Sequence, residues 1–330
     1  MSGAGVYLRT YLAAFEPLLA RPDVTDILVN RPGEVWIETA LDGMTRLVAP
    51  EVTETMLSRL AQQIAAASHQ GVNREQPLLA ATLPGGARVQ VIAPPATRGP
   101  MALAIRKHVV HDLTLASLAA EGAFSAVARA DLAVARSVDP AISALLDAGR
   151  HQDFFAAAVR SKLTILISGG TGTGKTTFLN ALLKEVPIEE RLIVIEDTPE
   201  VRLEQPNAVG LVAVKGELGE ARVDVDSLMQ AALRMRPDRL LVGEVRGAEA
   251  FTFLRAINTG HPGSITTIHA DSPRGALEQL AFMALQAGVA LSRSEIIAYA
   301  RETIDVIVQL GRQGGRRVVS AVALTRDVAL

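Results

Sequence analysis

The sequence is poor in several residue types, and each shortage excludes a class of protein. Its 330 residues contain no cysteine, one tryptophan and three tyrosines. A chain without cysteine has neither disulfides nor a cysteine-ligated zinc site, which fits a reducing compartment. Basic and acidic residues nearly balance, at 33 against 35, so the basic face of a nucleic-acid-binding protein is not indicated. We expect no direct sequence-specific binding of nucleic acid.

Long apolar runs are missing as well. No stretch approaches the roughly 20 apolar residues that a bilayer-spanning helix requires, and the N-terminus lacks the pattern of a signal peptide. Hydrophobic residues nevertheless make up 49% of the chain. Much of that share is alanine, which favours alanine-rich helices rather than a membrane protein. We therefore expect a cytoplasmic, soluble chain with two domains.

Residues 1–107 are predicted to form an N-terminal α+β domain. In its first segment Leu8, Leu12, Phe15 and Leu19 follow helical spacing. A helix docked on the core explains this pattern. A membrane-surface helix is the alternative, although its polar side would carry more Lys and Arg than this one does.

The remainder of this domain indicates an antiparallel sheet with one further helix. Residues 26–39 hold two short β-rich runs around a Pro-Gly turn, which predicts a hairpin. Residues 87–95 and 101–108 alternate apolar and polar side chains, as strands do. Residues 53–68 predict a helix whose apolar face carries Leu57, Leu60, Ile64 and Ala67.

The second half of the chain has a different pattern. Residues 108–150 are alanine-rich and predict a helical linker region without recognisable chemistry. In residues 151–330 continuous apolar runs alternate with helical patterns, which indicates an α/β domain with a buried, mainly parallel sheet. The expected fold class is therefore α/β, with this second domain following the α+β one.

A glycine-rich loop at the start of the second domain predicts a nucleotide site. The sequence matches G-x-x-x-x-G-K-[ST] from Gly169, between an apolar strand and a helix, which is the context that binds phosphate. Only five lysines occur in the chain, and one of them lies here. An ordinary glycine-rich turn is the alternative explanation. The predicted phosphate-binding residues are Gly170, Thr171, Gly172, Thr173, Gly174, Lys175, Thr176 and Thr177.

Acidic residues follow two of the later apolar runs. Glu244 comes after residues 240–242, at a strand end where it would support Mg²⁺ or, alternatively, pair with a nearby arginine. Glu196, Asp197 and Glu200 follow another run, and a carboxylate there would orient or deprotonate the attacking water. Three acids in five residues would also suit a solvated turn.

Four segments, in chain order, resemble the motif boxes of the secretion and traffic ATPases. They are GGTGTGKTTFLNAL (169–182), IVIEDTPE (193–200), LRMRPDRLLVGEVRGAEA (233–250) and TGHPGSITTIHADS (259–272). Within this superfamily the chain is most similar to the cytoplasmic hexameric ATPases of type IV secretion and conjugation, the VirB-eleven family. The length, the N-terminal DVTDILVNRPGEVWIE and the short linker without a zinc module support that choice.

The resemblance implies roles for the residues in these boxes. Lys175 matches the lysine that reaches the β- and γ-phosphates, and Thr176 matches the Mg²⁺ ligand. Glu200 matches the glutamate that activates water, and Glu244 matches the second-box acid near the metal. His269 matches the second of two box histidines that sense the γ-phosphate region.

The resemblance also implies roles for His261, Arg88 and Arg106, although each position has an alternative, purely structural explanation. His261 matches the first box histidine, although alone it would be interpreted as an interface or helix-end residue. Arg88 and Arg106 lie on the two predicted strands of the first domain, where solvated arginines are common. In the resembling family, arginines on these strands reach the nucleotide, and an arginine that neutralises transition-state charge makes hydrolysis depend on domain closure. Arg106 is the stronger candidate.

The implied function is that of a homohexameric ATPase with a RecA-like second domain, with ATP and Mg²⁺ as cofactors. It would power substrate export or pilus assembly with inner-membrane and cytoplasmic components of a secretion machine, peripherally at the inner membrane. Pilus and type II secretion ATPases share the boxes, although type II enzymes usually carry a cysteine-ligated zinc, and conjugation ATPases of the Trb type also stay open. A RecA-type DNA motor and an ATP-binding scaffold with little turnover are rivals from other classes.

Overall fold

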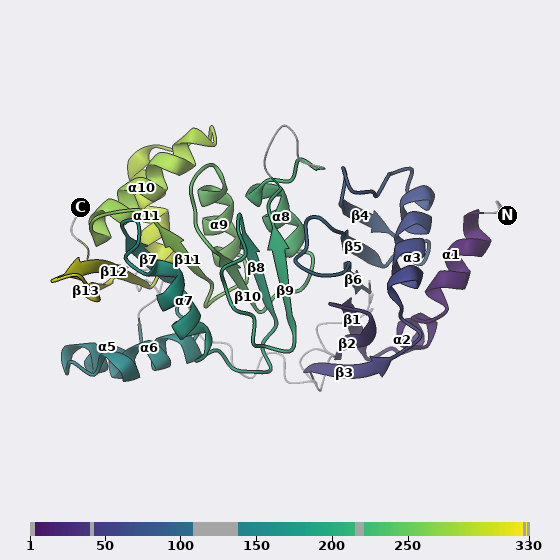
Figure 1. Ribbon diagram of the computed structural model, residues 1–330, viewed down its shortest axis with the longest axis horizontal. Helices are drawn as coiled ribbons and strands as arrows, with labels where there is room; N and C mark the ends of the chain where they lie inside the picture. The colour runs from purple at the N-terminus through teal and green to yellow at the C-terminus, as the bar shows by residue number, and fades with distance from the viewer. Residues whose placement is uncertain (1–3, 40–42, 108–137, 215–220, 326–327, 329–330) are drawn as a thin grey trace, which may run out of the picture.

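The computed structural model describes residues 4–39, 43–107, 138–214, 221–325 and 328, and these residues form two sheets with flanking helices (Figure 1). The first sheet has the strand order β3-β2-β1-β6-β5-β4, and all of its described pairings are antiparallel. The second has the order β13-β12-β7-β11-β10-β8-β9 and is parallel except for β13. The expected combination of an antiparallel and a mainly parallel sheet is confirmed.

The elements of the N-terminal sheet and its helices follow the chain closely. The strands are β1 Val24–Val29, β2 Gly33–Thr39, β3 Gly43–Ala49, β4 Leu78–Thr82, β5 Arg88–Ile92 and β6 Ala102–Arg106. The helices are α1 Ala4–Leu12, α2 Glu16–Ala20 and α3 Glu54–Ala67. The predicted hairpin is therefore present as β1 and β2, and the two later predicted strands are β5 and β6.

Two details of the helical predictions differ from the structure. The first segment forms two helices instead of one, because Pro17 at the start of α2 has no N–H and cannot continue α1. Leu8, Leu12 and Phe15 are nevertheless buried, as a docked helix requires. On α3, Ala67 is exposed, and the buried face ends at Ile64 and Ala65.

Both faces of the N-terminal sheet are covered. Successive side chains of a strand point to opposite faces. Ile27 and Val29 of β1 pack in the cluster with α1 and α3, whereas Leu28 belongs to the cluster formed with the second half of the chain. Figure 1 shows α1 and α3 on the side of this sheet that faces away from the second sheet. The sheet is thereby fixed against the rest of the molecule.

The second half of the chain has helices on both faces of its sheet. The strands are β7 Ile165–Gly169, β8 Leu192–Glu196, β9 Ala208–Val212, β10 Arg239–Val242, β11 Ile265–Ile268, β12 Val306–Gln313 and β13 Arg316–Leu324. The helices are α5 Pro140–Asp147, α6 His151–Arg160, α7 Lys175–Leu183, α8 Val225–Ala232, α9 Glu249–Asn258, α10 Pro273–Gln286 and α11 Arg293–Thr303. One core cluster joins α8–α11 to the sheet, and another joins α5–α7 to its opposite face.

The strand order decides which loops meet. Strands β7, β11, β10 and β8 are parallel neighbours, so the segments that follow them emerge at one edge of the sheet. In an open α/β sheet that edge is where ligands bind. The predicted linker region, residues 108–150, lies mostly outside the described residues; its described part, residues 138–150, contains α5. None of the described helices is long and apolar enough to cross a membrane.

Candidate functional site

The loop after β7 is shaped by its glycines. Gly172 and Gly174 have φ angles of +73° and +93°, in the left-handed region that favours glycine. At Gly174 an added Cβ would also lie 3.0 Å from Cδ of Arg317. Gly169 has no room either, because a Cβ there would lie 2.6 Å from the Thr173 hydroxyl. These glycines allow the loop its tight turn directly before the N-terminus of α7, where an anion is favoured.

Lys175, the first residue of α7, folds back across this loop. Its Nζ donates to the carbonyl oxygen of Gly169 at 3.0 Å and lies 3.2 Å from Nε2 of His269. Partial burial lowers the pKa of the lysine below its ordinary value, and the nearby Glu244 carboxylate acts in the opposite direction. The ammonium thus lies against the loop, in contact with carbonyl and imidazole groups that a phosphate could replace.

Thr176 faces the acidic loop that follows β8. Its hydroxyl donates to Oε2 of Glu200 at 2.9 Å. The backbone carbonyl of Glu200 accepts a hydrogen bond from Asn180 on the same helix as Thr176. The structure therefore brings the predicted metal ligand and the predicted water-activating glutamate together, although they are 24 residues apart in the sequence.

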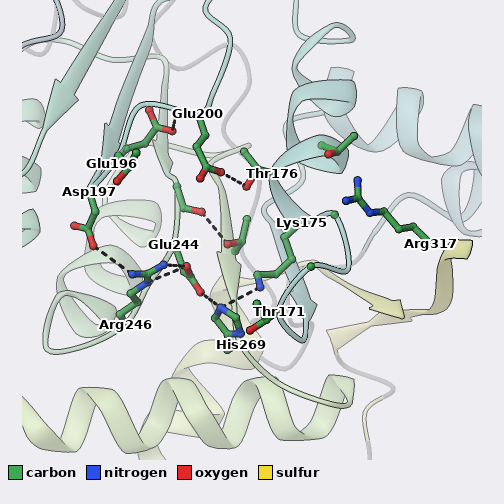
Figure 2. A pocket seen from close by; sticks show the side chains of 16 residues that line it. Thr171, Lys175, Thr176, Glu196, Asp197, Glu200, Glu244, Arg246, His269 and Arg317 are labelled. Carbon is green, nitrogen blue, oxygen red and sulfur yellow. Dashed lines mark hydrogen bonds and ion pairs between the residues drawn. The ribbon is translucent and has the colours of Figure 1, made fainter. Parts of the chain in front are cut away.

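Glu244 lies after β10 and has two partners at the site (Figure 2). His269, directly after β11, places Nε2 2.6 Å from Oε1 of this carboxylate. Arg246 donates from Nε to Oε2 at 2.8 Å and also lies 3.7 Å from Asp197. The hydrogen bond to Glu244 raises the pKa of the Arg246 guanidinium. Glu244 therefore pairs with a nearby arginine, as the alternative interpretation of the sequence had it. It also lies near Lys175, as expected for a site residue.

Glu196 has a structural task that its neighbours do not share. Its side chain is buried, and Oε1 accepts the backbone N–H groups of Glu200 and Val201, both at 2.9 Å. Its other oxygen pairs with Arg98. All three acids of this segment line the cleft, and Glu196 in addition shapes the loop that carries Glu200.

A polar cleft of about 380 Å³ lies where these segments meet. The groups that line this cleft suit a nucleoside triphosphate with a divalent cation. The glycine-rich loop offers backbone donors, Lys175 offers a positive charge, and Thr176, Glu200 and Glu244 offer oxygen ligands. Among the described residues no group of three or more His, Cys, Asp or Glu side chains forms a metal cage. A cation at this site would therefore be held partly by phosphate oxygens.

Several predicted residues lie elsewhere. His261 precedes β11, at the end of the strand opposite His269, and its ring contacts the carbonyl of Ala256 at 3.1 Å. The four residues of β11 span roughly 13 Å, so the two box histidines serve different regions. His261 is not among the residues that line the cleft.

Arg88 and Arg106 also lie outside this cleft of their own chain. They are directly opposite each other on β5 and β6, and both line a separate cavity of about 410 Å³ together with Arg234. Arg106 Nε is 3.9 Å from Oδ1 of Asp26. Like charges directly opposite in a sheet are unfavourable. The structure therefore gathers these arginines into a basic pocket without bringing them to Lys175.

Besides Arg246, three arginines contact the site or its loops without having been predicted from the sequence as site residues. Arg317 on β13 lines the cleft beside Gly174, and Arg312 on β12 donates to the carbonyl of Gly172 at 3.0 Å. Arg98, from the loop between β5 and β6, contacts the segment that carries Glu200. Arg312 and Arg317 belong to the basic run GRQGGRR, which is the only signal that could have marked them. Nothing in the sequence around Arg98 indicates its contact.

Comparisons with known proteins agree on one family. The model for the Type II/IV secretion system protein family matches residues 10–314. The type IV secretion system protein PtlH of Bordetella pertussis is 40% identical over 322 residues, covering 94% of this chain and 93% of PtlH. VirB11 of Bartonella quintana is 36% identical over 326 residues, covering 95% and 91% of the two chains. The crystal structure of the VirB11 ATPase of the Brucella suis type IV secretion system, in complex with sulphate, superimposes with a TM-score of 0.89 at 34% identity, covering 98% of this chain and 96% of that one.

Proposed function

The chain belongs to the family of type II/IV secretion system proteins and functions as a secretion ATPase, and we propose that it hydrolyses ATP in the cleft beside Lys175 to power a type IV secretion machine. One observation carries the assignment of the site. Lys175, Thr176, Glu200, Glu244 and His269 come from four separate segments and converge on one cleft at the carboxyl edge of the parallel sheet. Export of a substrate and assembly of a pilus are both compatible with this chemistry.

Binding of the triphosphate would use the loop and the lysine. The backbone N–H groups of residues 170–176 would surround the β-phosphate, and Lys175 would exchange its carbonyl partners for phosphate oxygens. Thr176 and Glu244 would hold Mg²⁺ directly or through water. When bound, Mg²⁺ would neutralise part of the phosphate charge.

Hydrolysis would then need an oriented water molecule. Glu200 lies 2.9 Å from the Thr176 hydroxyl, so its carboxylate faces the region of the γ-phosphate and can accept the proton of the water. The water oxygen bonds to the γ-phosphorus while the bond to the β–γ bridging oxygen breaks, which leaves ADP and phosphate. His269 lies between Lys175 and Glu244, where it would contact the γ-phosphate region and register its departure.

We propose that Arg88 and Arg106 act on a nucleotide only after assembly or domain movement. Both line the basic pocket with Arg234 instead of their own cleft. The unfavourable pairing of two guanidinium groups across β5 and β6 would be relieved by an anion. A homohexamer would provide one, if the pocket of one subunit faced the phosphates of the next. His261 would contribute at such an interface as well, because it lies away from the cleft of its own chain.

We place the hexamer at the cytoplasmic face of the inner membrane, held peripherally by inner-membrane and cytoplasmic components of the secretion machine. The near balance of basic and acidic residues makes direct recognition of a nucleic-acid sequence an unsuitable role. The relatives are proteins of type IV secretion systems, which favours this system over type II secretion or pilus retraction.

The native mass of the purified 34.9 kDa chain, with and without a non-hydrolysable ATP analogue, tests this proposal. We expect a hexamer that the analogue favours and that Lys175→Ala no longer forms in response to nucleotide. ATP hydrolysis is measured in parallel, with and without single-stranded DNA. A monomer or dimer under all conditions would contradict the ring, and hydrolysis that requires DNA would favour a RecA-type motor instead.

A further inference from the structure

The loop between β5 and β6 extends the second sheet. Thr97 forms an antiparallel bridge with Leu211 of β9, Val212 donates to the carbonyl of Ala96 at 2.9 Å, and Arg98 donates from its backbone to the carbonyl of Gly210 at 2.9 Å. These residues belong to the connection between two strands of the N-terminal sheet, yet they form an isolated β-bridge with the edge strand of the ATPase sheet. The position of Arg98 is therefore defined by both halves of the chain.

The Arg98 side chain crosses β9 and reaches the loop after β8. An added Cβ at Gly210 would lie 2.5 Å from Cδ of Arg98, so the glycine leaves the space through which this side chain runs. The Arg98 guanidinium donates from Nη1 to the carbonyl oxygen of Val201 at 2.7 Å and pairs with the carboxylate of Glu196. Both contacts are to the segment that carries Glu200.

A continuous chain of contacts leads from Arg98 to the phosphate loop. Glu196 is 4% exposed, so its charge depends on the partners it finds inside the protein. One carboxylate oxygen pairs with Arg98, and the other accepts the N–H groups of Glu200 and Val201. Glu200 in turn accepts the hydrogen bond from Thr176. Removal of Arg98 would leave the Glu196 carboxylate without its cation and the Val201 carbonyl without its donor.

We propose that Arg98 is a positioning residue that holds Glu200 at the catalytic distance from Thr176 and transmits the position of the N-terminal half to the hydrolytic site. This inference rests on the proposed role of Glu200 in activating water. Because Arg98 is carried by the β5–β6 connection, a displacement of the N-terminal sheet withdraws it from Glu196 and releases residues 197–201. Hydrolysis then requires that the two halves of one chain are docked on each other. This requirement does not involve a second subunit.

The test compares Arg98→Met and Arg98→Lys with Arg59→Met, which removes an exposed arginine from α3. Steady-state ATP hydrolysis gives kcat and KM, and a fluorescent ADP analogue gives the dissociation constant. We expect Arg98→Met to lower kcat at least tenfold while KM and ADP affinity change less than twofold. Arg98→Lys, which keeps the charge, is expected to restore part of kcat, and Arg59→Met to leave every quantity unchanged.

A second variant tests the same contact without removing the arginine. Gly210→Ala places a methyl group against Cδ of Arg98, whereas Gly85→Ala, in the turn between β4 and β5, meets no heavy atom within 4 Å. Of these two variants, we expect only Gly210→Ala to lower kcat. Like Arg98→Met, it should also increase hydrogen exchange of residues 197–203. Faster exchange throughout the chain in both variants would overturn the inference, because it would indicate a general loss of stability.

A double variant separates this inference from the proposed function. If Arg98 acts through Glu200, Arg98→Met lowers kcat less than twofold further when Glu200→Gln is already present. Multiplied defects, or full activity of Arg98→Met beside an inactive Glu200→Gln, would overturn the positioning role and leave the catalytic role of Glu200 standing. Full activity of Glu200→Gln would instead overturn the catalytic role, and the inference with it.

Discussion

Nε2 of His269 lies 2.6 Å from Oε1 of Glu244, at the point where β11 and β10 end side by side. The same nitrogen is 3.2 Å from Nζ of Lys175, so the imidazole connects the acid to the lysine of the phosphate loop. This arrangement explains why a histidine follows the SITTI segment. The strand carries His269 to the carboxyl edge of the sheet and leaves His261 at the opposite edge.

Replacement of His269 and of His261 by alanine is therefore predicted to have different effects. We expect His269→Ala to lower kcat about tenfold or more, because Glu244 and Lys175 lose a shared partner in the cleft. His261→Ala is the matched control and is expected to change kcat less than about twofold in single-subunit turnover, measured at protein concentrations that do not favour assembly. Equal losses in the two variants would contradict the placement of His269 alone in the cleft.

Glu244→Gln and Lys175→Ala are predicted to stop hydrolysis at different stages. The glutamine keeps the size of Glu244 and removes its charge, so ATP still binds to the loop but is hydrolysed at least about 100-fold more slowly. Lys175→Ala removes the charge that holds the phosphates, so binding itself is lost. Retention of labelled ATP after rapid gel filtration distinguishes them. Equal nucleotide release from both variants would count against a catalytic cycle in this cleft.

The φ angle of Gly174 predicts a loss of nucleotide binding in Gly174→Ala. An alanine at φ +93° costs about 1–2 kcal/mol, and its methyl group would also press on Arg317. Gly170→Ala provides the control in the same loop, because its added Cβ would lie 4.0 Å from the nearest atom, Cγ2 of Thr173. Titration with a fluorescent ADP analogue measures both. Equal affinities in the two variants would show that the left-handed conformation at residue 174 is not required.

Burial of Lys175 predicts how nucleotide affinity depends on pH. Its pKa is lowered below the ordinary 10.5, and only the charged form attracts phosphate. Affinity should therefore fall as the pH rises through this lowered pKa, and binding at alkaline pH should take up a proton. Calorimetry in buffers of different ionisation enthalpy measures that uptake. Lys175→Arg stays charged at these pH values and should show none, whereas uptake of the same size in this variant would assign the proton to another group.

Arg191 is predicted to be important for stability rather than turnover. It is fully buried, burial lowers its pKa to about 9, and Nη1 donates to Asn30 at 2.7 Å and to Asn207 at 2.5 Å. Arg191→Met removes the donor to Asn30 Oδ1 and to the Met235 carbonyl and one of the two donors to Asn207 Oδ1, and should lower the free energy of unfolding by about 2–4 kcal/mol in urea. The exposed Arg59→Met should change it by less than about 0.5 kcal/mol. Asn30→Ala and Asn207→Ala should each show part of this stability loss, and unchanged stability in both variants would contradict this account.

Local features of the molecule were predictable from the sequence. The phosphate loop is contiguous, and its conformation depends on glycines at neighbouring positions, so Lys175 and Thr176 could be assigned directly. The acids after β8 and β10 could be placed at one edge because parallel strands end together. The break between α1 and α2 was missed, although Pro17 marks it, because the apolar spacing continues across the break.

The contacts between distant segments were decided by the tertiary structure alone. Arg98 contacts Val201, which is 103 residues away, and Arg317 lies beside Gly174, which is about 140 residues away; the periodicity of a strand says nothing about which sheet edge a loop will join. Arg88 and Arg106 could be placed on strands, but only the packing of β5 and β6 against α8 decides that they face Arg234 and not Lys175. Residue order specifies the elements and the chemistry each one carries, because these depend on neighbours along the chain. Which side chains meet depends on how the two sheets bury their apolar faces against each other, and that is settled only when the whole chain is folded.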